Sequence, residues 1–190
     1  MPKDEPAAFE VTNTEVAFEG KIWDVQRETF DYNGALLTRE FVKHTGAVAV
    51  IALDESQRIL MIRQYRHPVR EFLWEIPAGL LDIPGEPKLE AAQRELLEES
   101  GYTAGSWSHL QDFFTTPGGN DELISIFLAR ELKLVGHDIE LHGEEVDMRT
   151  EWVPLQEAIS AVLSSQLKSP SAVVAILALA AKISRGEQLG

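Results

Sequence analysis

Three glutamates in the middle of the chain have the types and the spacing needed to bind a metal ion. Glu95, Glu98 and Glu99 stand at positions i, i+3 and i+4, so a helix through them would place the three carboxylates on one face. Like charges at these spacings destabilise a helix by about 0.2–0.5 kcal/mol per pair. Such a face is therefore either fully solvated or neutralised by a cation, and Mg²⁺ is a hard cation that prefers carboxylate and phosphate oxygens.

The residues around these glutamates predict a helix from about Lys88 to Ser100. Apolar residues recur with helical spacing on a second face, and the glycine that follows is typical of a helix C-terminus. The predicted apolar stripe consists of Leu89, Ala92, Leu96 and Leu97. This helix is expected to bury one face and to hold the glutamates on another.

The segment from Gly79 to Tyr102 resembles the Nudix box. In that pattern a Glu is followed, after seven residues, by Arg-Glu, an aliphatic residue, any residue, Glu-Glu, any residue, Gly, and an aliphatic or aromatic residue. Here Glu86 is followed, after seven residues, by Arg-Glu-Leu-Leu-Glu-Glu-Ser-Gly-Tyr. The pattern also has a Gly six positions before its first Glu, and the one departure here is that Gly79 lies seven positions before Glu86. Loops tolerate insertions far better than helices do, so this departure concerns the path of the loop and not the helix.

The resemblance implies a divalent-metal site for Mg²⁺ or Mn²⁺, with two to three ions per active site. Glu95 and Glu99 would be the principal metal ligands, and Glu98 a further, water-mediated one. Arg94 and Glu86 would form a pair that orients these carboxylates. For Arg94 taken alone, an ordinary helix salt bridge with the glutamate four residues before it is the alternative interpretation.

The segment Gln64–Gly79, just before the box, resembles the ADP-ribose pyrophosphatase branch of the Nudix hydrolases. In that branch a Tyr-Arg pair and a Glu-x-Pro-Ala-Gly stretch lead into the box, and this chain has both. The resemblance implies that the backbone carbonyl of Ala78 ligates a metal ion. It also implies that Arg66 contacts the diphosphate.

Two features after the box match the same branch. Pro117 lies sixteen residues after the box glycine, where a proline accompanies ADP-ribose activity, although an ordinary turn in Thr-Pro-Gly-Gly is the alternative. The acidic stretch 142–148 is similar to the loop that brings a glutamate to the attacking water. Glu144 is preferred over Glu145 as that base, and a solvated loop is the competing interpretation.

The N-terminal strands are the expected place of base recognition. In this branch, aromatic and Arg residues of these strands hold the base and the ribose, partly from the other subunit. Arg39, Phe41 and Trp23 are the candidates here, and Trp23 could equally belong to the core of a hairpin. Strands with so little apolar mass are marginal alone, which agrees with the domain-exchanged homodimer that the resemblance implies.

The rest of the sequence indicates the elements that position these residues. Residues 16–44 alternate apolar and polar side chains around a turn at 31–34 and predict a β-hairpin. Residues 46–53 form a continuous apolar run, typical of a strand buried on both faces. Further strands are predicted at 59–65, 107–114, 124–129 and 149–153, and helices at 155–164 and 171–183.

These elements predict an α/β fold with helices on both faces of the sheet. The resemblance implies a Nudix-fold α/β/α sandwich with a mixed sheet, plus a small N-terminal antiparallel β-subdomain. The expected domains are a flexible leader over 1–15, a β-subdomain for dimerisation and base recognition over 16–44, and the hydrolase domain over 45–190.

The charge balance and the absence of cysteine exclude several classes of function. The chain has 17 basic and 31 acidic residues, a net charge of −14, which disfavours binding to nucleic acid or to an anionic membrane. Residues 71–100 hold eight acids and two bases, whereas residues 58–70 hold four arginines and no acid. With no cysteine there is no disulfide, thiolate zinc site or cysteine nucleophile. We see no signal or membrane-spanning segment and expect a cytoplasmic protein.

We therefore expect Mg²⁺-dependent hydrolysis of the diphosphate of ADP-ribose to AMP and ribose 5-phosphate. Metal ions would neutralise the anionic oxygens and lower the pKa of a bound water. The alternative is a pyrophosphatase for another nucleoside-diphosphate sugar or a dinucleotide. A catalytically silent ADP-ribose sensor is a further alternative, and the three retained box glutamates argue against it.

Overall fold

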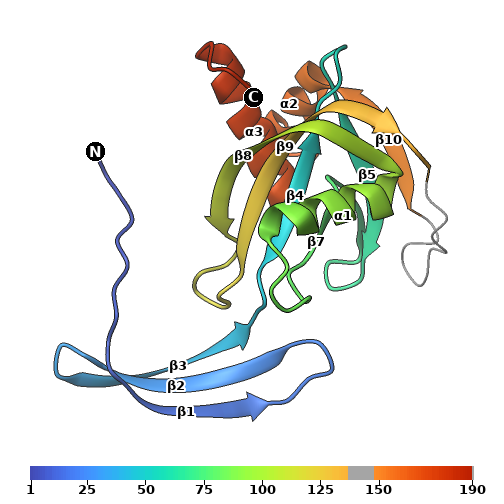
Figure 1. Ribbon diagram of the computed structural model, residues 1–190. Coiled ribbons are helices and arrows are strands. Elements are labelled where there is room, and N and C mark those ends of the chain that lie inside the picture. The colour runs from blue at the N-terminus through green and yellow to red at the C-terminus, as the bar shows by residue number, and fades with distance from the viewer. Residues whose placement is uncertain (137–147, 190) are drawn as a thin grey trace. The chain divides into compact units, whose positions relative to one another are not determined.

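The computed structural model describes residues 1–136 and 148–189, which divide into two compact units (Figure 1). The first unit consists of residues 1–45 together with residues 114–122, and the second contains the other described residues. The loop that carries Pro117 therefore belongs to the same unit as the N-terminal strands, although it follows them by about 70 residues in the sequence.

The first unit contains an antiparallel sheet in the order β1-β2-β3. Its strands are β1 (Val11–Phe18), β2 (Asp24–Tyr32) and β3 (Ala35–Lys43). The predicted hairpin is formed by β2 and β3. Asn33 and Gly34 in its turn both adopt left-handed backbone angles, as a two-residue hairpin turn requires. Asp31 Oδ1 accepts a hydrogen bond of 2.6 Å from the Gly34 N–H. β1 begins inside the range predicted as a leader and pairs with β2.

The second unit contains two sheets and three helices in its described part. One sheet has the order β7-β4-β9-β8, with β4 parallel to β9 and antiparallel to β7, so it is mixed as predicted. The other has the order β10-β5-β6. The elements are β4 (Ala47–Ala52), β5 (Arg58–Arg66), β6 (Glu71–Glu75), β7 (Ala78–Leu80), α1 (Lys88–Ser100), β8 (Tyr102–Phe114), β9 (Leu123–Leu134), β10 (Arg149–Pro154), α2 (Leu155–Leu163) and α3 (Pro170–Ser184).

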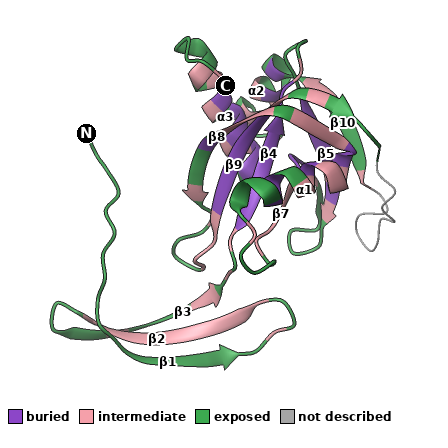
Figure 2. Ribbon diagram, in the orientation of Figure 1, coloured by how far each residue is buried: buried purple, intermediate pink, exposed green. Residues whose placement is uncertain are grey.

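The strand β4 forms the centre of the core and is buried along its whole length (Figure 2). Its residues alternate between two faces. Val48 and Val50 pack in a cluster with α1, whereas Ala49 and Ile51 pack in a cluster with residues of α2 and α3. A strand covered on both faces has no polar side, which explains the continuous apolar run in the sequence.

The helix α1 lies against the sheet through small residues. Ala91 and Ala92 are fully buried, and Leu96 is buried beside them. The predicted stripe was wrong at Leu89, which is 38% exposed because it lies in the first turn and faces away from the sheet cluster. Gly101 ends the helix as predicted, with φ of 73° and its N–H donating to the Leu97 carbonyl at 2.8 Å.

The second unit is thus an α/β/α sandwich, as expected, with α1 on one side of the mixed sheet and α2 and α3 on the other (Figure 1). No helix in the described ranges is long and apolar enough to cross a membrane.

Candidate active site

Arg94 is the centre of the polar face of α1. Its guanidinium donates from Nε to Glu86 Oε1 at 3.1 Å and from Nη2 to Glu86 Oε2 at 3.0 Å. This two-bond geometry fixes the orientation of both groups. The hydrogen bonds to Glu86 raise the pKa of Arg94 and lower that of Glu86, so the pair stays ionised. Glu86 lies in the loop before α1, and the pair therefore ties that loop to the helix.

The same guanidinium also contacts two glutamates of its own helix. Arg94 Nη1 donates to Glu95 Oε1 at 2.5 Å and to Glu98 Oε2 at 3.1 Å. These partners, rather than Glu90, are the ones that the structure gives to Arg94. The glutamates differ in exposure, since the side chain of Glu98 is 42% exposed and that of Glu95 only 12%. Arg94 therefore holds one carboxylate in the interior and one at the surface.

The carboxylate of Glu95 lies directly against the backbone of β7. A Cβ added at Gly79 would lie 2.0 Å from both Cδ and Oε1 of Glu95, and 2.5 Å from Oε2. Any side chain at Gly79 would therefore occupy the space of this carboxylate. The final glycine of the Glu-x-Pro-Ala-Gly stretch is thus needed to seat Glu95.

Glu99 reaches the same strand one residue earlier. Its Oε2 accepts a hydrogen bond of 2.8 Å from the Ala78 N–H. Burial raises the pKa of Glu99 to about 8, although this hydrogen bond favours the ionised form and opposes the shift. Burial likewise raises the pKa of Glu95, against the opposing effect of Arg94. Two desolvated carboxylates thus converge on residues 78–79.

This donor set fits a hard divalent cation. Two carboxylates that are both disfavoured as anions would be stabilised by a positive charge between them. By themselves, the described His, Asp and Glu side chains form no group of three close enough to hold an ion.

Arg66 stands at the end of β5 and pairs with Glu75 at the end of β6. Its Nε donates to Glu75 Oε1 at 2.9 Å and its Nη2 to Glu75 Oε2 at 2.7 Å. Glu75 is buried, whereas the Arg66 side chain is 44% exposed. Both charges also act on Glu99. Burial, the hydrogen bond from Ala78 and the charge of Glu95 have the largest effects on the pKa of Glu99; Arg66 then lowers this pKa and Glu75 raises it. The Arg66–Glu75 pair therefore adjoins the carboxylates of α1.

The predicted base-binding residues lie in the first unit. Trp23 is half-buried and stacks on the His44 ring. Phe41 is half-buried on β3 opposite Gln26, and Arg39 is exposed on the same strand. Pro117 is the second residue of a β-turn that Gly119 closes with a 2.8 Å hydrogen bond to the Thr116 carbonyl, and its association with ADP-ribose activity stays a prediction. Glu144 and Glu145 lie outside the described residues.

Comparison with known proteins agrees with this geometry. The family model of the NUDIX domain matches residues 43–173, which include every element from β4 to α2. The chain belongs to the NUDIX family. Its α/β/α sandwich is the Nudix fold, and Nudix hydrolases generally use divalent metal ions.

Two relatives from bacteria cover most of the chain. An ADP-ribose pyrophosphatase of Mycobacterium tuberculosis is 42% identical over 172 residues, which are 90% of this chain and 83% of that protein. An ADP-ribose pyrophosphatase of Bacillus subtilis is 39% identical over 85% of this chain and 87% of that protein. A solved structure described as an ADP compounds hydrolase has a TM-score of 0.79 at 20% identity, covers 98% of this chain and shares its fold.

Two parts of the Nudix site were not predicted from the residues. The Arg66–Glu75 pair joins adjacent strands, and opposite charges nine positions apart in sequence do not reveal such pairing. The contact of Glu95 with Gly79 was also missed, although a glycine within a strand is a known sign of close approach by another group. The pairing of Arg94 with Glu86 agrees with what the family resemblance implied.

Proposed function

We propose that this NUDIX enzyme hydrolyses the diphosphate of ADP-ribose to AMP and ribose 5-phosphate. The observation that carries the proposal is the convergence of the Glu95 and Glu99 carboxylates on the backbone at residues 78–79. The two ADP-ribose pyrophosphatases, 42% and 39% identical over most of the chain, support the choice of substrate.

Glu95, Glu99 and the Ala78 carbonyl would hold Mg²⁺ or Mn²⁺, with Glu98 as a further, water-mediated ligand. When bound, two to three such ions would neutralise the diphosphate oxygens and lower the pKa of a bound water. The protein's own contribution is to keep the carboxylates in place. Arg94, anchored by Glu86, restrains Glu95 and Glu98 so that they do not separate when a ligand leaves.

Arg66 is proposed to contact the phosphates. Its bidentate contact with Glu75 restrains the guanidinium before substrate arrives, so less side-chain freedom is lost on binding. A partly exposed arginine at the edge of a site with several carboxylates supplies the positive charge that an anionic substrate needs there.

Glu144 is proposed as the general base that deprotonates the attacking water, in preference to Glu145. The two isosteric variants Glu144→Gln and Glu145→Gln separate these choices. The variant that lacks the base should lose orders of magnitude in kcat with little change in KM, while the other variant should keep most of its activity. Wild-type kcat in both variants would exclude both glutamates as the base.

Trp23, Phe41 and Arg39 are proposed to hold the adenine and the ribose, with Pro117 shaping the adjoining loop. An aromatic ring offers a stacking surface to the base, and an arginine offers donors to ribose and phosphate oxygens. Alanine variants should raise KM for ADP-ribose more than they lower kcat, because the adenine and the ribose contribute to binding without being part of the bond that breaks.

A homodimer in which the N-terminal units are exchanged is also proposed. The whole of β1 is exposed (Figure 2), and large apolar side chains in the first unit are uncovered: Val16, Phe18, Ile22 and Leu36 are each more than half exposed. Exposed apolar groups on a small sheet favour association. Light scattering after size-exclusion chromatography should give twice the 21.2 kDa chain mass, and a monomer would contradict this.

The decisive experiment is magnesium-dependent release of AMP from ADP-ribose. It should be run beside a sugar nucleotide and a diadenosine polyphosphate, with kcat/KM compared across the three substrates. A preference for either competitor would show that the substrate is another nucleoside-diphosphate sugar or a dinucleotide. No release from any substrate, with binding of ADP-ribose retained, would point instead to a sensor.

A further inference from the structure

Trp23 is fixed in the first unit through both its backbone and its ring. Gly20 approaches so closely that a Cβ there would lie 2.1 Å from the Trp23 carbonyl oxygen. The Gly20 N–H donates to Asp24 Oδ1 at 3.1 Å, which closes this turn. The indole itself stacks on the imidazole of His44, with 4.1 Å between ring centroids and 20° between the planes. The turn and the stack together determine where the indole lies.

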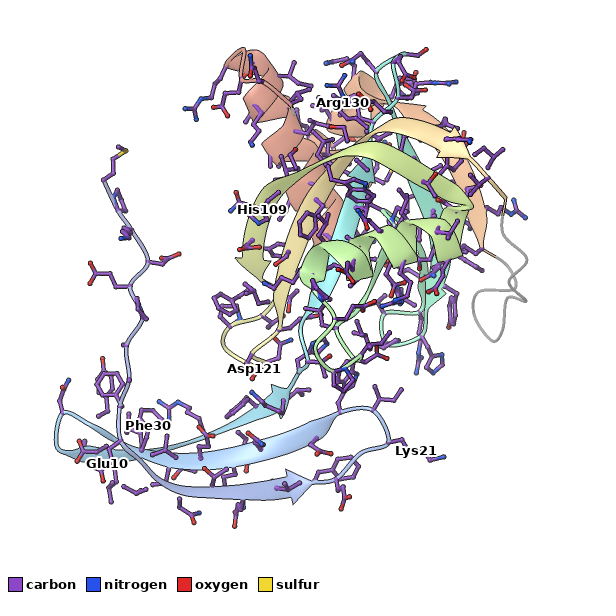
Figure 3. The ribbon with its side chains drawn as sticks, in the orientation of Figure 1. Glu10, Lys21, Phe30, His109, Asp121 and Arg130 are labelled. Carbon is purple, nitrogen blue, oxygen red and sulfur yellow. The ribbon has the colours of Figure 1, made fainter. Side chains whose placement is uncertain are left out.

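His44 is itself held by the loop 114–122 of the same unit. Its Nε2 lies 3.2 Å from Glu122 Oε1, with both side chains largely buried. Its backbone N–H donates to Asp121 Oδ1 at 2.7 Å, and Asp121 also binds Lys43 (Asp121 is labelled in Figure 3). Thr115 Oγ1 donates to the other Glu122 oxygen at 2.7 Å. The hydrogen bond from Thr115 therefore fixes the orientation of the Glu122 carboxylate that contacts the imidazole.

The His44 imidazole packs flat against one face of the Trp23 indole. Although the imidazole covers this face, Trp23 is only half-buried, so part of its side chain is accessible. Aromatic rings contribute to nucleic-acid and nucleotide binding by stacking on bases. A ring that is already immobilised loses little conformational freedom when a base stacks on it. Behind the partly exposed indole lie the largely buried side chains of His44 and Glu122.

We propose that His44, held by Glu122, is a positioning residue that presents the Trp23 indole as a stacking platform for a purine base. The proposal rests on the proposed hydrolysis of ADP-ribose, whose base is adenine. His44 acts only through Trp23 and is not a contact of the base. A purine is favoured over a pyrimidine because its two fused rings cover more of the indole.

The test is a double-mutant cycle of AMP binding, measured by calorimetry without metal so that it does not depend on turnover. Trp23→Ala and His44→Ala should each weaken AMP binding about tenfold, which corresponds to about 1.4 kcal/mol. The double variant should bind no more weakly than Trp23→Ala, because His44 has no effect once its target is gone. His109→Ala, an exposed histidine of β8 (Figure 3), is the matched control and should bind like the wild type.

A conservative variant separates positioning from mere folding. His44→Phe keeps a flat ring against the indole and loses only the contact with Glu122, so it should recover AMP binding to within about threefold of the wild type, the remaining loss being the contribution of Glu122. In turnover, His44→Ala should raise KM for ADP-ribose with kcat within about twofold of the wild type.

Several outcomes would overturn the platform. These are unchanged AMP binding in His44→Ala, additive losses in the double variant, failure of His44→Phe to recover binding, or no AMP binding by the wild type. A wild-type protein that binds AMP through this cycle but releases none from ADP-ribose would instead contradict the proposed function and leave the platform standing.

Discussion

Replacing Gly79 by alanine should reduce catalysis strongly without unfolding the protein. The added Cβ would lie 2.0 Å from Cδ and Oε1 of Glu95, whereas ordinary contact begins at 3.4 Å. The carboxylate would therefore have to retreat by roughly 1.4 Å, the difference between these distances. Gly79 lies in β7 without a positive φ, so alanine suits its backbone, and the atoms that must move are at the end of a flexible side chain.

Displacement on this scale is large for a metal ligand, because metal–ligand distances are held to within about 0.2 Å. A misplacement of about 1 Å can cost about 10²-fold in rate, which is about 2.7 kcal/mol of transition-state stabilisation. We expect kcat/KM for ADP-ribose to fall about 100-fold and the magnesium midpoint to rise about 10-fold to 100-fold. Both are measured by AMP release across a magnesium titration.

Gly105→Ala is the matched control for this experiment. Its added Cβ would lie 2.7 Å from Glu131 Oε2, so it also displaces a carboxylate, but one that lies on β9 and has no part in the site. Its kcat/KM should stay close to the wild-type value. The reasoning fails if Gly79→Ala retains wild-type kcat/KM and magnesium dependence, or if its thermal midpoint in the absence of metal falls so far that lost folding explains the lost activity.

Three further changes test the site and the first unit. Glu99→Gln should lower kcat by orders of magnitude. Burial raises the pKa of Glu99 to about 8 from 4.5, so between these values the folded state retains a proton that the unfolded chain releases, and the free energy of unfolding of the metal-free wild type should fall as pH rises. Urea unfolding should show a smaller decrease of this free energy with pH in the variant. Arg94→Lys should lower kcat/KM by about 10-fold to 100-fold, because a lysine cannot reproduce the two-bond contact with Glu86, and Glu86→Gln should show a similar loss in the same assay. Asp121→Asn should destabilise the protein by about 0.5–1 kcal/mol at pH 7. Burial disfavours the Asp121 anion, but its bonds with Lys43 and the backbone N–H of His44 prevail and lower its pKa from 3.8. The difference from the wild type in thermal unfolding should therefore begin to shrink as pH falls below 3.8 and vanish below the folded pKa.

The helix α1 was predictable from the sequence because its signals are local. The helix occupies Lys88–Ser100, as predicted, and the glycine after it stops the helix by its own backbone preference. The buried stripe was less predictable. Ala92 and Leu96 of the predicted stripe are buried against the sheet, but Ala91 is buried there as well and Leu89 is not, because alanine carries little information about which face of a helix is covered.

The site was predictable only where a motif preserves spacing along the chain. The Glu86–Arg94 pair joins residues eight positions apart within one loop and helix, and the family resemblance covers both. The contacts between distant segments were not accessible in this way. The stack of Trp23 on His44, and the contact of His44 with Glu122, depend on how the hairpin and the loop 114–122 meet within their unit. No local periodicity encodes such a meeting, because it depends on the packed structure.

The two alanines on the buried face of α1 limit how this enzyme can vary. Ala91 and Ala92 are fully buried between the helix and the sheet, so the smallest side chains set the height at which Glu95 and Glu99 stand above β7. A larger side chain there would overpack this contact and force the backbone of the helix to shift. In a random mutant library, substitutions at these two positions should therefore be scored as active-site defects, although neither residue could ever touch the substrate.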